Sequence, residues 1–274
     1  MYSRAYVEIT NICNMNCSFC HGHSREPRQM TEEEYARVLK QLEGKTRYIY
    51  HHLMGEPLIH PLLPRFIQMA HQAGFHPMLT TNGTLLERLG DTILIPGLHR
   101  VNISLHSFEG DRQEDHERYL RQVAEFARRA IREGTIISLR LWNNGCDEGR
   151  NHTTLKLFKE LFPEPWVENT RGYRIRDGLF LEWGDRFVWP DQNAADGGER
   201  VFCHGLKDHF GILCDGTVVP CCLDSDGVIA LGNVFREELA DILDSPRAKA
   251  IADGFQRRKA AEDLCRRCGY ARKF

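Results

Sequence analysis

Two hydrophobic periods alternate along the first 190 residues of the chain. Short apolar runs bounded by turn residues predict strands near 7–12, 48–50, 75–79, 100–105 and 135–141. Between them, apolar residues at helical spacing predict helices near 64–73, 115–132 and 153–162. Strands that alternate with helices in this way favour β-α units and a parallel sheet.

A further helix has a start signal of its own. Thr31 and Glu34 fit a capping box, and the apolar residues after it recur at helical spacing, at Tyr35, Val38, Leu39 and Leu42. The sequence therefore predicts a helix that buries one face and ends before Gly44.

The composition changes near residue 190, where the chain becomes polar and rich in glycine, as a linker would. We expect a large domain over 1–190 and a small α+β domain over 191–274. In the second domain, Asp215 and Gly216 separate two apolar runs and predict a tight β-hairpin between 210–214 and 217–221. A helical segment is expected near 236–252.

Composition limits the compartments and the classes of partner that can be expected. The 274 residues carry a formal net charge of −2, which gives no reason to expect nucleic acid or an anionic membrane as partner. No apolar run approaches the ~18 residues of a membrane span, and the N-terminus lacks the apolar stretch of a signal peptide. The 10 cysteines therefore predict metal ligands in a reducing cytoplasm rather than disulfides.

Three cysteines form a C-x3-C-x2-C run at Cys13, Cys17 and Cys20, directly after the first predicted strand. Thiolates so close in sequence can converge on one metal centre, either an iron-sulfur cluster or zinc. A zinc site would need a fourth ligand, for which His21 and His23 are the neighbouring candidates. A [4Fe-4S] cluster held by three cysteines would leave one iron open.

With Phe19 just before the third cysteine, this run resembles the signature of radical S-adenosylmethionine (SAM) enzymes. The resemblance implies that SAM chelates the open iron of a [4Fe-4S] cluster and that its reductive cleavage yields a 5′-deoxyadenosyl radical. It also implies a partial (β/α)6 TIM-like barrel with the cofactor at the carboxyl ends of the strands. The radical chemistry would belong to the cofactors.

Further segments resemble SAM-binding elements of that superfamily. Gly55 and Glu56 stand where the family has a Gly-Gly-Glu turn that binds the methionine amine, although Met54 replaces the first glycine. Asn82 follows the next strand, and Ser104 ends the fourth, where the family's serine reaches the cofactor. These four residues, with Phe19, are the cofactor-binding candidates.

The C-terminal cysteines resemble those of the twitch domain, a shortened relative of the SPASM domain that holds an auxiliary [4Fe-4S] cluster. The resemblance implies four ligands, Cys203, Cys221, Cys265 and Cys268, at spacings of 18, 44 and 3 residues. Zinc in a closed four-cysteine site is the alternative. Cys222 could replace Cys221, because adjacent strand residues face opposite sides.

Other candidates lie near the end of the fifth predicted strand. Arg140 and Asn143 are expected either to bind SAM or substrate or to lie on the surface. Cys146 follows them and is the best candidate for a thiol that donates hydrogen to a substrate radical, whereas free cysteines are otherwise small buried hydrophobes.

Three classes of function follow from the resemblance. The first is a dehydrogenase that oxidises its substrate and passes an electron to the auxiliary cluster. The second is a peptide or protein maturase that forms a cross-link or thioether. The third is a redox-neutral epimerase, with a non-catalytic electron carrier as the weakest alternative. Each acts on a small molecule or peptide and needs a reducing partner such as flavodoxin or ferredoxin.

Overall fold

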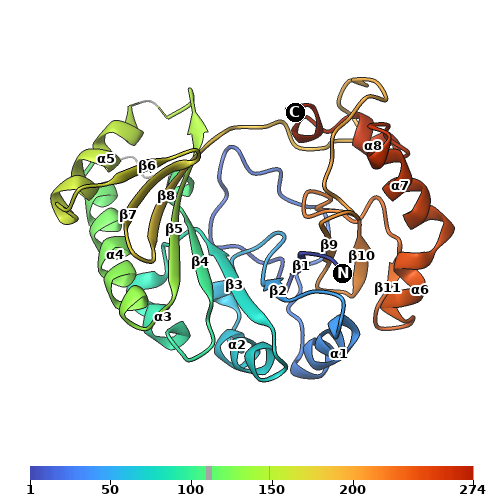
Figure 1. The fold of residues 1–274 in the computed structure, drawn as a ribbon, viewed down its shortest axis with the longest axis horizontal. Helices are drawn as coiled ribbons and strands as arrows, with labels where there is room; N and C mark the ends of the chain where they lie inside the picture. The colour runs from blue at the N-terminus through green and yellow to red at the C-terminus, as the bar shows by residue number, and fades with distance from the viewer. Residues whose placement is uncertain (109–112, 148, 274) are drawn as a thin grey trace.

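The protein is described by a computed structural model that covers residues 1–108, 113–147 and 149–273. Within these residues, eleven strands form one continuous sheet in the order β11-β10-β9-β1-β2-β3-β4-β5-β8-β7-β6. Figure 1 shows the sheet as a curved layer, with the helices of the first 161 residues along its outer side.

The centre of the sheet is parallel and confirms the predicted partial barrel. Its strands are β1 (Arg4–Val7), β2 (Tyr48–Tyr50), β3 (His76–Thr81), β4 (Arg100–Ser104), β5 (Ile136–Asn144) and β8 (Leu179–Asp185). The helices between them are α1 (Glu32–Leu42), α2 (Leu63–Gln72), α3 (Leu86–Ile93), α4 (Gln113–Arg132) and α5 (Arg150–Leu161). Single 3-10 turns, η1 (Pro57–Ile59) and η2 (Leu105–Ser107), follow β2 and β4.

The predicted capping box is present at the start of α1. The Thr31 hydroxyl accepts the Glu34 amide hydrogen, and the Glu34 carboxylate accepts the Thr31 amide hydrogen. The apolar face of α1 is buried, because Tyr35, Val38 and Leu42 are all fully covered.

The parallel strands have one apolar and one polar face. In β5, Ile137, Leu139 and Leu141 join the buried core that packs on the helices. Side chains alternate across a strand, so Ser138 and Arg140 point to the inner face, which Figure 1 shows free of helices α1 to α5. This polar inner face differs from the packed apolar interior of a closed eight-stranded barrel.

Several regions depart from the sequence expectations. The first strand begins earlier than the predicted Val7, at Arg4, since Ala5 also faces the core. The periodicity did not reveal α3 or the antiparallel strands β6 (Val167–Asn169) and β7 (Gly172–Arg176), which extend the sheet beyond β8. The strand β6 is exposed throughout, so it has no alternating pattern to detect.

The C-terminal strands return to the first strand of the barrel. The strand β9 (His209–Ile212) pairs in parallel with β1, and the predicted hairpin joins it to β10 (Thr217–Val219). Gly216 in the turn has φ +86°, which favours glycine. The short strand β11 (Gly232–Asn233) then closes this edge of the sheet.

The single helix expected over 236–252 is wrong. Two helices occupy the region, α6 (Leu239–Asp244) and α7 (Pro246–Gln256), because Pro246 cannot continue a helix and instead begins the next one, with Ser245 as its cap. The chain ends in α8 (Asp263–Arg266) and the turn η3 (Tyr270–Arg272). Among the described residues, no helix has both the length and the apolar character of a membrane span.

Candidate functional site

The first three cysteines lie in the loop after β1, at the carboxyl ends of the parallel strands. The Cys17 thiol contacts the Ser107 carbonyl oxygen at 3.6 Å, and the Cys20 amide donates to the Cys17 carbonyl at 3.0 Å. Burial raises the pKa of Cys13, and the nearby charges of Glu56 and Cys20 raise it further. The loop therefore lies beside the ends of β2 and β4, although among the described residues its three thiols are not close enough together to hold one metal ion.

Gly55 brings the turn after β2 into direct contact with this loop. A Cβ at this position would lie 2.4 Å from the Thr10 carbonyl oxygen and 2.9 Å from that of Ile12, and φ is +74°. Glycine is needed on both counts. The Glu56 amide donates to the Ile12 oxygen at 2.9 Å, so the turn is fixed against the residue that precedes Cys13.

The Glu56 side chain is buried and bonded within the protein. Its carboxylate accepts hydrogen bonds from the Leu58 amide at 3.1 Å, the Thr81 hydroxyl at 2.7 Å and the Asn82 amide at 2.8 Å. Burial nevertheless raises the pKa of Glu56 to about 7. The carboxylate orders the turn and the end of β3, and its expected contact with the SAM ammonium stays a prediction.

Asn82 connects β3 to the cysteine loop. Its amide nitrogen donates to the Asn14 side-chain oxygen at 3.0 Å, and its carbonyl accepts the Tyr119 hydroxyl at 2.8 Å. Its side-chain oxygen accepts from both the amide and the hydroxyl of Thr84. Asn82 thus stands beside the expected cofactor position, with its side chain engaged by the loop between Cys13 and Cys17.

Phe19 packs between two later segments of the chain. Its ring lies 5.1 Å from that of His106 in η2, and the Arg186 guanidinium lies 5.3 Å from its centre. The Trp189 indole nitrogen donates to the Phe19 carbonyl oxygen at 3.1 Å. Ser104 is the last residue of β4, two residues before His106, and it is half-buried. The residue before the third cysteine is therefore held by the segments that follow β4 and β8.

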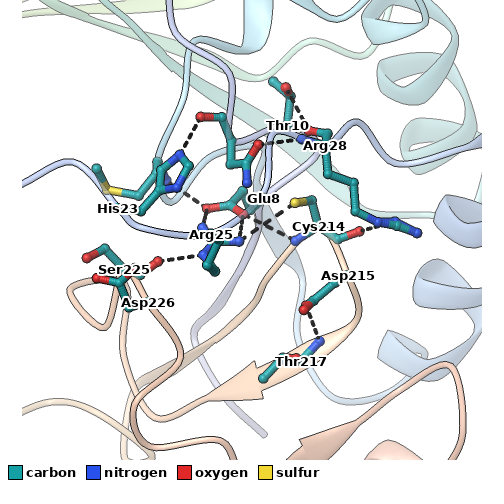
Figure 2. A network of polar contacts seen from close by, with 12 residues as sticks. Glu8, Thr10, His23, Arg25, Arg28, Cys214, Asp215, Thr217, Ser225 and Asp226 are labelled. Carbon is teal, nitrogen blue, oxygen red and sulfur yellow. Dashed lines mark hydrogen bonds and ion pairs between the residues drawn. The ribbon is translucent and has the colours of Figure 1, made fainter. Parts of the chain in front are cut away.

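A charged pair joins the loop to the C-terminal strands, as Figure 2 shows. Glu8 follows β1 and is fully buried, and it accepts two hydrogen bonds from Arg25. The same carboxylate accepts the amides of Met54 at 3.1 Å and Cys214 at 3.2 Å. Arg25 also donates to the Ser225 carbonyl at 2.7 Å. These contacts set the cysteine loop, the Gly55 turn and the hairpin in one arrangement.

The residues expected near the end of β5 separate onto different faces. Arg140 lies on the inner face, stacked over Trp142 at 4.6 Å and 3.8 Å from Glu182. Asn143 alternates to the helix side, where its oxygen accepts the Asn151 amide of α5 at 3.0 Å. This placement argues against the expected contact of Asn143 with cofactor or substrate. Cys146 is exposed in the turn that follows.

Four C-terminal cysteines surround one pocket. Cys203 comes before β9, Cys221 follows β10, and the last two lie at α8, so three separate segments contribute. The full lining is Cys203, Cys221, Cys265 and Cys268 with Pro190, Pro220, Asp224, Ile229, Phe255, Leu264 and Ala271. In the described part of the chain, no three His, Cys, Asp or Glu side chains are placed to hold one metal ion, so the sulfurs ring a pocket rather than meet at a point.

The chemistry of these thiols fits a bound iron-sulfur cluster, whose iron ions are cations. Burial raises the pKa of Cys203 to about 11 and that of Cys221 well above its ordinary value, and the neighbouring thiols raise both further. Buried thiolates in contact need positive charge to become stable, which bound iron would supply. The apolar wall of the pocket would shield the group from water.

The remaining C-terminal cysteines lie outside this pocket. Cys222 packs with Tyr6, Leu53 and Leu213, and burial raises its pKa to about 11 against a hydrogen bond from Tyr6. Cys214 is buried beside Arg25, whose guanidinium lies 3.7 Å from its sulfur. The two neighbours Cys221 and Cys222 thus face opposite ways, as expected of consecutive residues at a strand end.

Comparison with known proteins agrees with this arrangement. Residues 7–142 match the Radical SAM superfamily, and residues 203–269 match SPASM, an iron-sulfur cluster-binding domain. A protein of Methanococcus maripaludis strain C6, named a probable GTP 3′,8-cyclase, is 34% identical over an alignment that covers 84% of this chain and 88% of the relative. The chain belongs to the radical SAM superfamily.

Solved structures share the fold of this radical SAM protein. BtrN in complex with AdoMet and 2-DOIA has a TM-score of 0.62 at 18% identity, over 98% of this chain and 93% of BtrN. The enzyme anSMEcpe with bound AdoMet also has a TM-score of 0.62, at 15% identity, over 91% of this chain and 79% of the neighbour. The superfamily and the SPASM domain confirm the expected cofactors, which are SAM, its [4Fe-4S] cluster and an auxiliary cluster.

Sequence analysis of this radical SAM protein did not single out Glu8 or Arg25. A signal was available, because Glu8 interrupts an apolar strand and a carboxylate there is almost never buried without a partner. The partner could not be identified, since two arginines, Arg25 and Arg28, follow within the same loop. Tyr6, Arg100 and Glu182 on the inner face were also missed, because their partners cannot be identified from the sequence.

Proposed function

We propose that this radical SAM enzyme oxidises a small molecule by a dehydrogenase-type reaction. When bound, SAM and its [4Fe-4S] cluster supply a 5′-deoxyadenosyl radical, and the auxiliary cluster supplies an acceptor for the electron left after hydrogen abstraction. A low-potential carrier such as flavodoxin or ferredoxin would provide the reducing electron. The chain's own residues bind, orient and enclose these groups.

Residues around the barrel mouth would hold SAM and its cluster. Cys13, Cys17 and Cys20 are the proposed cluster ligands. The backbone at Gly55 would approach the methionine moiety, while Glu56 positions that turn and Asn82 positions the loop. Arg140 of β5 pairs in register with Ser104, the last residue of β4, so both can reach the same cofactor or substrate group. Phe19 would shield the third cysteine.

The observation that carries the oxidation proposal is the four-cysteine pocket. Cys203, Cys221, Cys265 and Cys268 can complete all four corners of a cluster, which leaves no open iron for substrate and suits electron transfer. The pocket is also close to the inner face, because Cys222 contacts Tyr6 of β1 and follows directly after Cys221.

A second candidate is the radical cyclisation of a purine nucleotide. It is favoured by the relative at 34% identity, whose name is that of a probable GTP 3′,8-cyclase. The two candidates differ in product mass, since a dehydrogenase product lacks two hydrogens and a cyclised product has the mass of its substrate.

Cys146 or Cys222 would be the hydrogen donor if the reaction were a redox-neutral epimerisation.

The first experiment is anaerobic reconstitution of the wild type and of a Cys13→Ala/Cys17→Ala/Cys20→Ala variant. About eight irons in the wild type and about four in the variant, with loss of 5′-deoxyadenosine formation, would support two clusters with the proposed ligands. About four irons in the wild type would remove the electron-acceptor role. Mass spectrometry of products from a substrate panel then decides between oxidation and cyclisation.

A further inference from the structure

The inner face of the barrel carries a group of polar side chains that are not among the proposed cluster ligands. Strand register places Asn102 beside Ser138 and Arg140 beside Glu182, all on the side opposite the helix-packed core. Arg100 lies on the same side of β4 as Asn102, two residues earlier. These five residues, here called the inner polar group, come from three adjacent strands.

Several polar atoms of this group are buried and lack a hydrogen-bond partner. Among the described residues, the unpaired buried atoms include Arg100 Nε, Arg140 Nε, Asn102 Oδ1 and Ser138 Oγ, together with His52 Nδ1 beside them. Asn102 and Ser138 are both 0% exposed. A buried polar atom without a partner is destabilising, so a cluster of them on one face indicates a ligand that satisfies them.

Glu182 lies between two guanidinium groups without saturating either. Its carboxylate oxygens are 3.8 Å from Arg100 Nη1 and 3.8 Å from Arg140 Nε, beyond hydrogen-bond distance. A guanidinium presents five donors in a planar fork that matches carboxylate and phosphate oxygens. Both forks therefore retain donors for an oxyanion.

The charge on this face is positive. Arg4 on β1 also faces inward, 5.9 Å from the centre of the Tyr50 ring. Burial lowers the pKa of His52 to about 3, so this side chain is neutral. Glu8 at the mouth is already matched by Arg25. Arg4, Arg100 and Arg140 thus outnumber the Glu182 carboxylate that lies between two of them.

We propose that the inner polar group binds an oxyanion of the substrate, a phosphate or carboxylate, and that the substrate is therefore anionic. This inference rests on the proposed function and deepens it. A cationic aminocyclitol would meet the guanidinium forks unfavourably, whereas a phosphate ester would bridge Arg100 and Arg140 and supply acceptors to their free donors. Asn102 and Ser138 would bind hydroxyls of the same molecule.

The carboxylate of SAM is the competing occupant. Arg140 lies beside Ser104, the last residue of β4, and could serve SAM, whereas Arg100 stands at the start of β4, four residues deeper. Arg100 is therefore the residue to change. Its matched control is Arg118 on the exposed side of α4, which pairs with Glu87 and is 71% exposed.

The test uses the anaerobically reconstituted holoenzyme with SAM at saturation, so that SAM already occupies its own site. Calorimetry measures binding of inorganic pyrophosphate, GTP and an uncharged cyclitol. We expect pyrophosphate and GTP to bind the wild type, Arg100→Gln to weaken both by about tenfold, and Arg118→Gln to change neither. Arg100→Lys keeps the charge without the fork and should lie between them.

Three results would overturn the proposal. They are no anion binding by the wild type, equal losses in the Arg100 and Arg118 variants, and a tenfold weaker affinity for SAM itself in Arg100→Gln. Circular dichroism establishes that each variant is folded. Because the readout is anion affinity, it is independent of product mass, so a failed oxidation assignment and a failed oxyanion site give different results.

Discussion

Arg25 donates to both carboxylate oxygens of Glu8, at 2.7 and 2.8 Å, in a site where Glu8 is fully buried. Glu8 extends from β1, Arg25 lies in the loop that carries the cluster cysteines, and Arg25 also reaches the Ser225 carbonyl of the C-terminal part. One ion pair thus fixes the first cysteine loop relative to the segments that form the four-cysteine pocket.

Arg25→Gln should destabilise the protein by about 3 kcal/mol, because it leaves the buried Glu8 carboxylate without its cation. Urea unfolding of the reconstituted protein measures the free energy. The control is Arg65→Gln, which removes an exposed pair with Glu32 and should cost less than about 1 kcal/mol. Equal costs for the two variants would show that the buried pair has no special part in stability.

Gly55→Ala should disrupt the SAM site. The new Cβ would lie 2.4 Å from the Thr10 carbonyl, a backbone atom that cannot move without displacing the cysteine loop. Gly44→Ala is the matched control, since Gly44 has a similar φ of +69° but no atom within 4 Å of the added carbon. We expect a cost of about 1 kcal/mol for the control from backbone strain alone. SAM affinity, measured by equilibrium binding, should fall only for Gly55→Ala; a parallel loss in both would assign the effect to φ.

The stability of the protein should fall as the pH rises through neutrality, because of Glu56. Its pKa in the folded state is about 7, above the ordinary 4.5, so folding favours the protonated form. This contribution is complete below pH 4.5 and is lost as the pH rises through 7. We expect the stability of the wild type relative to Glu56→Gln to drop by about 2 kcal/mol between pH 5.5 and 8.

Denaturation curves at four pH values measure that difference. Glu32→Gln, at an exposed carboxylate near the start of α1, is the control and should show no such trend. If the difference in unfolding free energy between the wild type and Glu56→Gln did not change with pH, the three hydrogen bonds to Glu56 would offset its burial and keep it ionised.

Features set by neighbouring residues could be predicted from the sequence. The capping box at Thr31 and the hairpin turn at Gly216 each depend on a few consecutive residues, so their pattern is complete in the sequence. The run from Cys13 to Cys20 is equally short. The prediction of a single helix over 236–252 was wrong, although the sequence carries the signal for a second helix. Ser245-Pro246 is a helix-start pair, and the spacing of the apolar residues does not reveal it.

Features set by distant residues could not be predicted. Glu8 meets the Cys214 amide 206 positions away, and no local pattern encodes that contact. The face of Asn143 depends on the register of β5 with its neighbours, and a shift of one residue reverses it. The inner polar group likewise exists only after three strands align, which explains why Arg100 and Glu182 did not stand out.

The adjacent cysteines Cys221 and Cys222 provide a test of the auxiliary site. Cys221 lines the four-cysteine pocket, while Cys222 packs against Tyr6 and Leu213 on the other side. In a Cys13→Ala/Cys17→Ala/Cys20→Ala background, where only auxiliary iron remains, Cys222→Ser should retain about four irons and Cys221→Ser should lose most of them. Iron and sulfide analysis with electron paramagnetic resonance after reduction measures both. The reverse pattern would exchange the two roles. Full retention in both variants would mean that Cys203, Cys265 and Cys268 hold the cluster without Cys221, either by themselves or with another donor of the pocket wall such as Asp224.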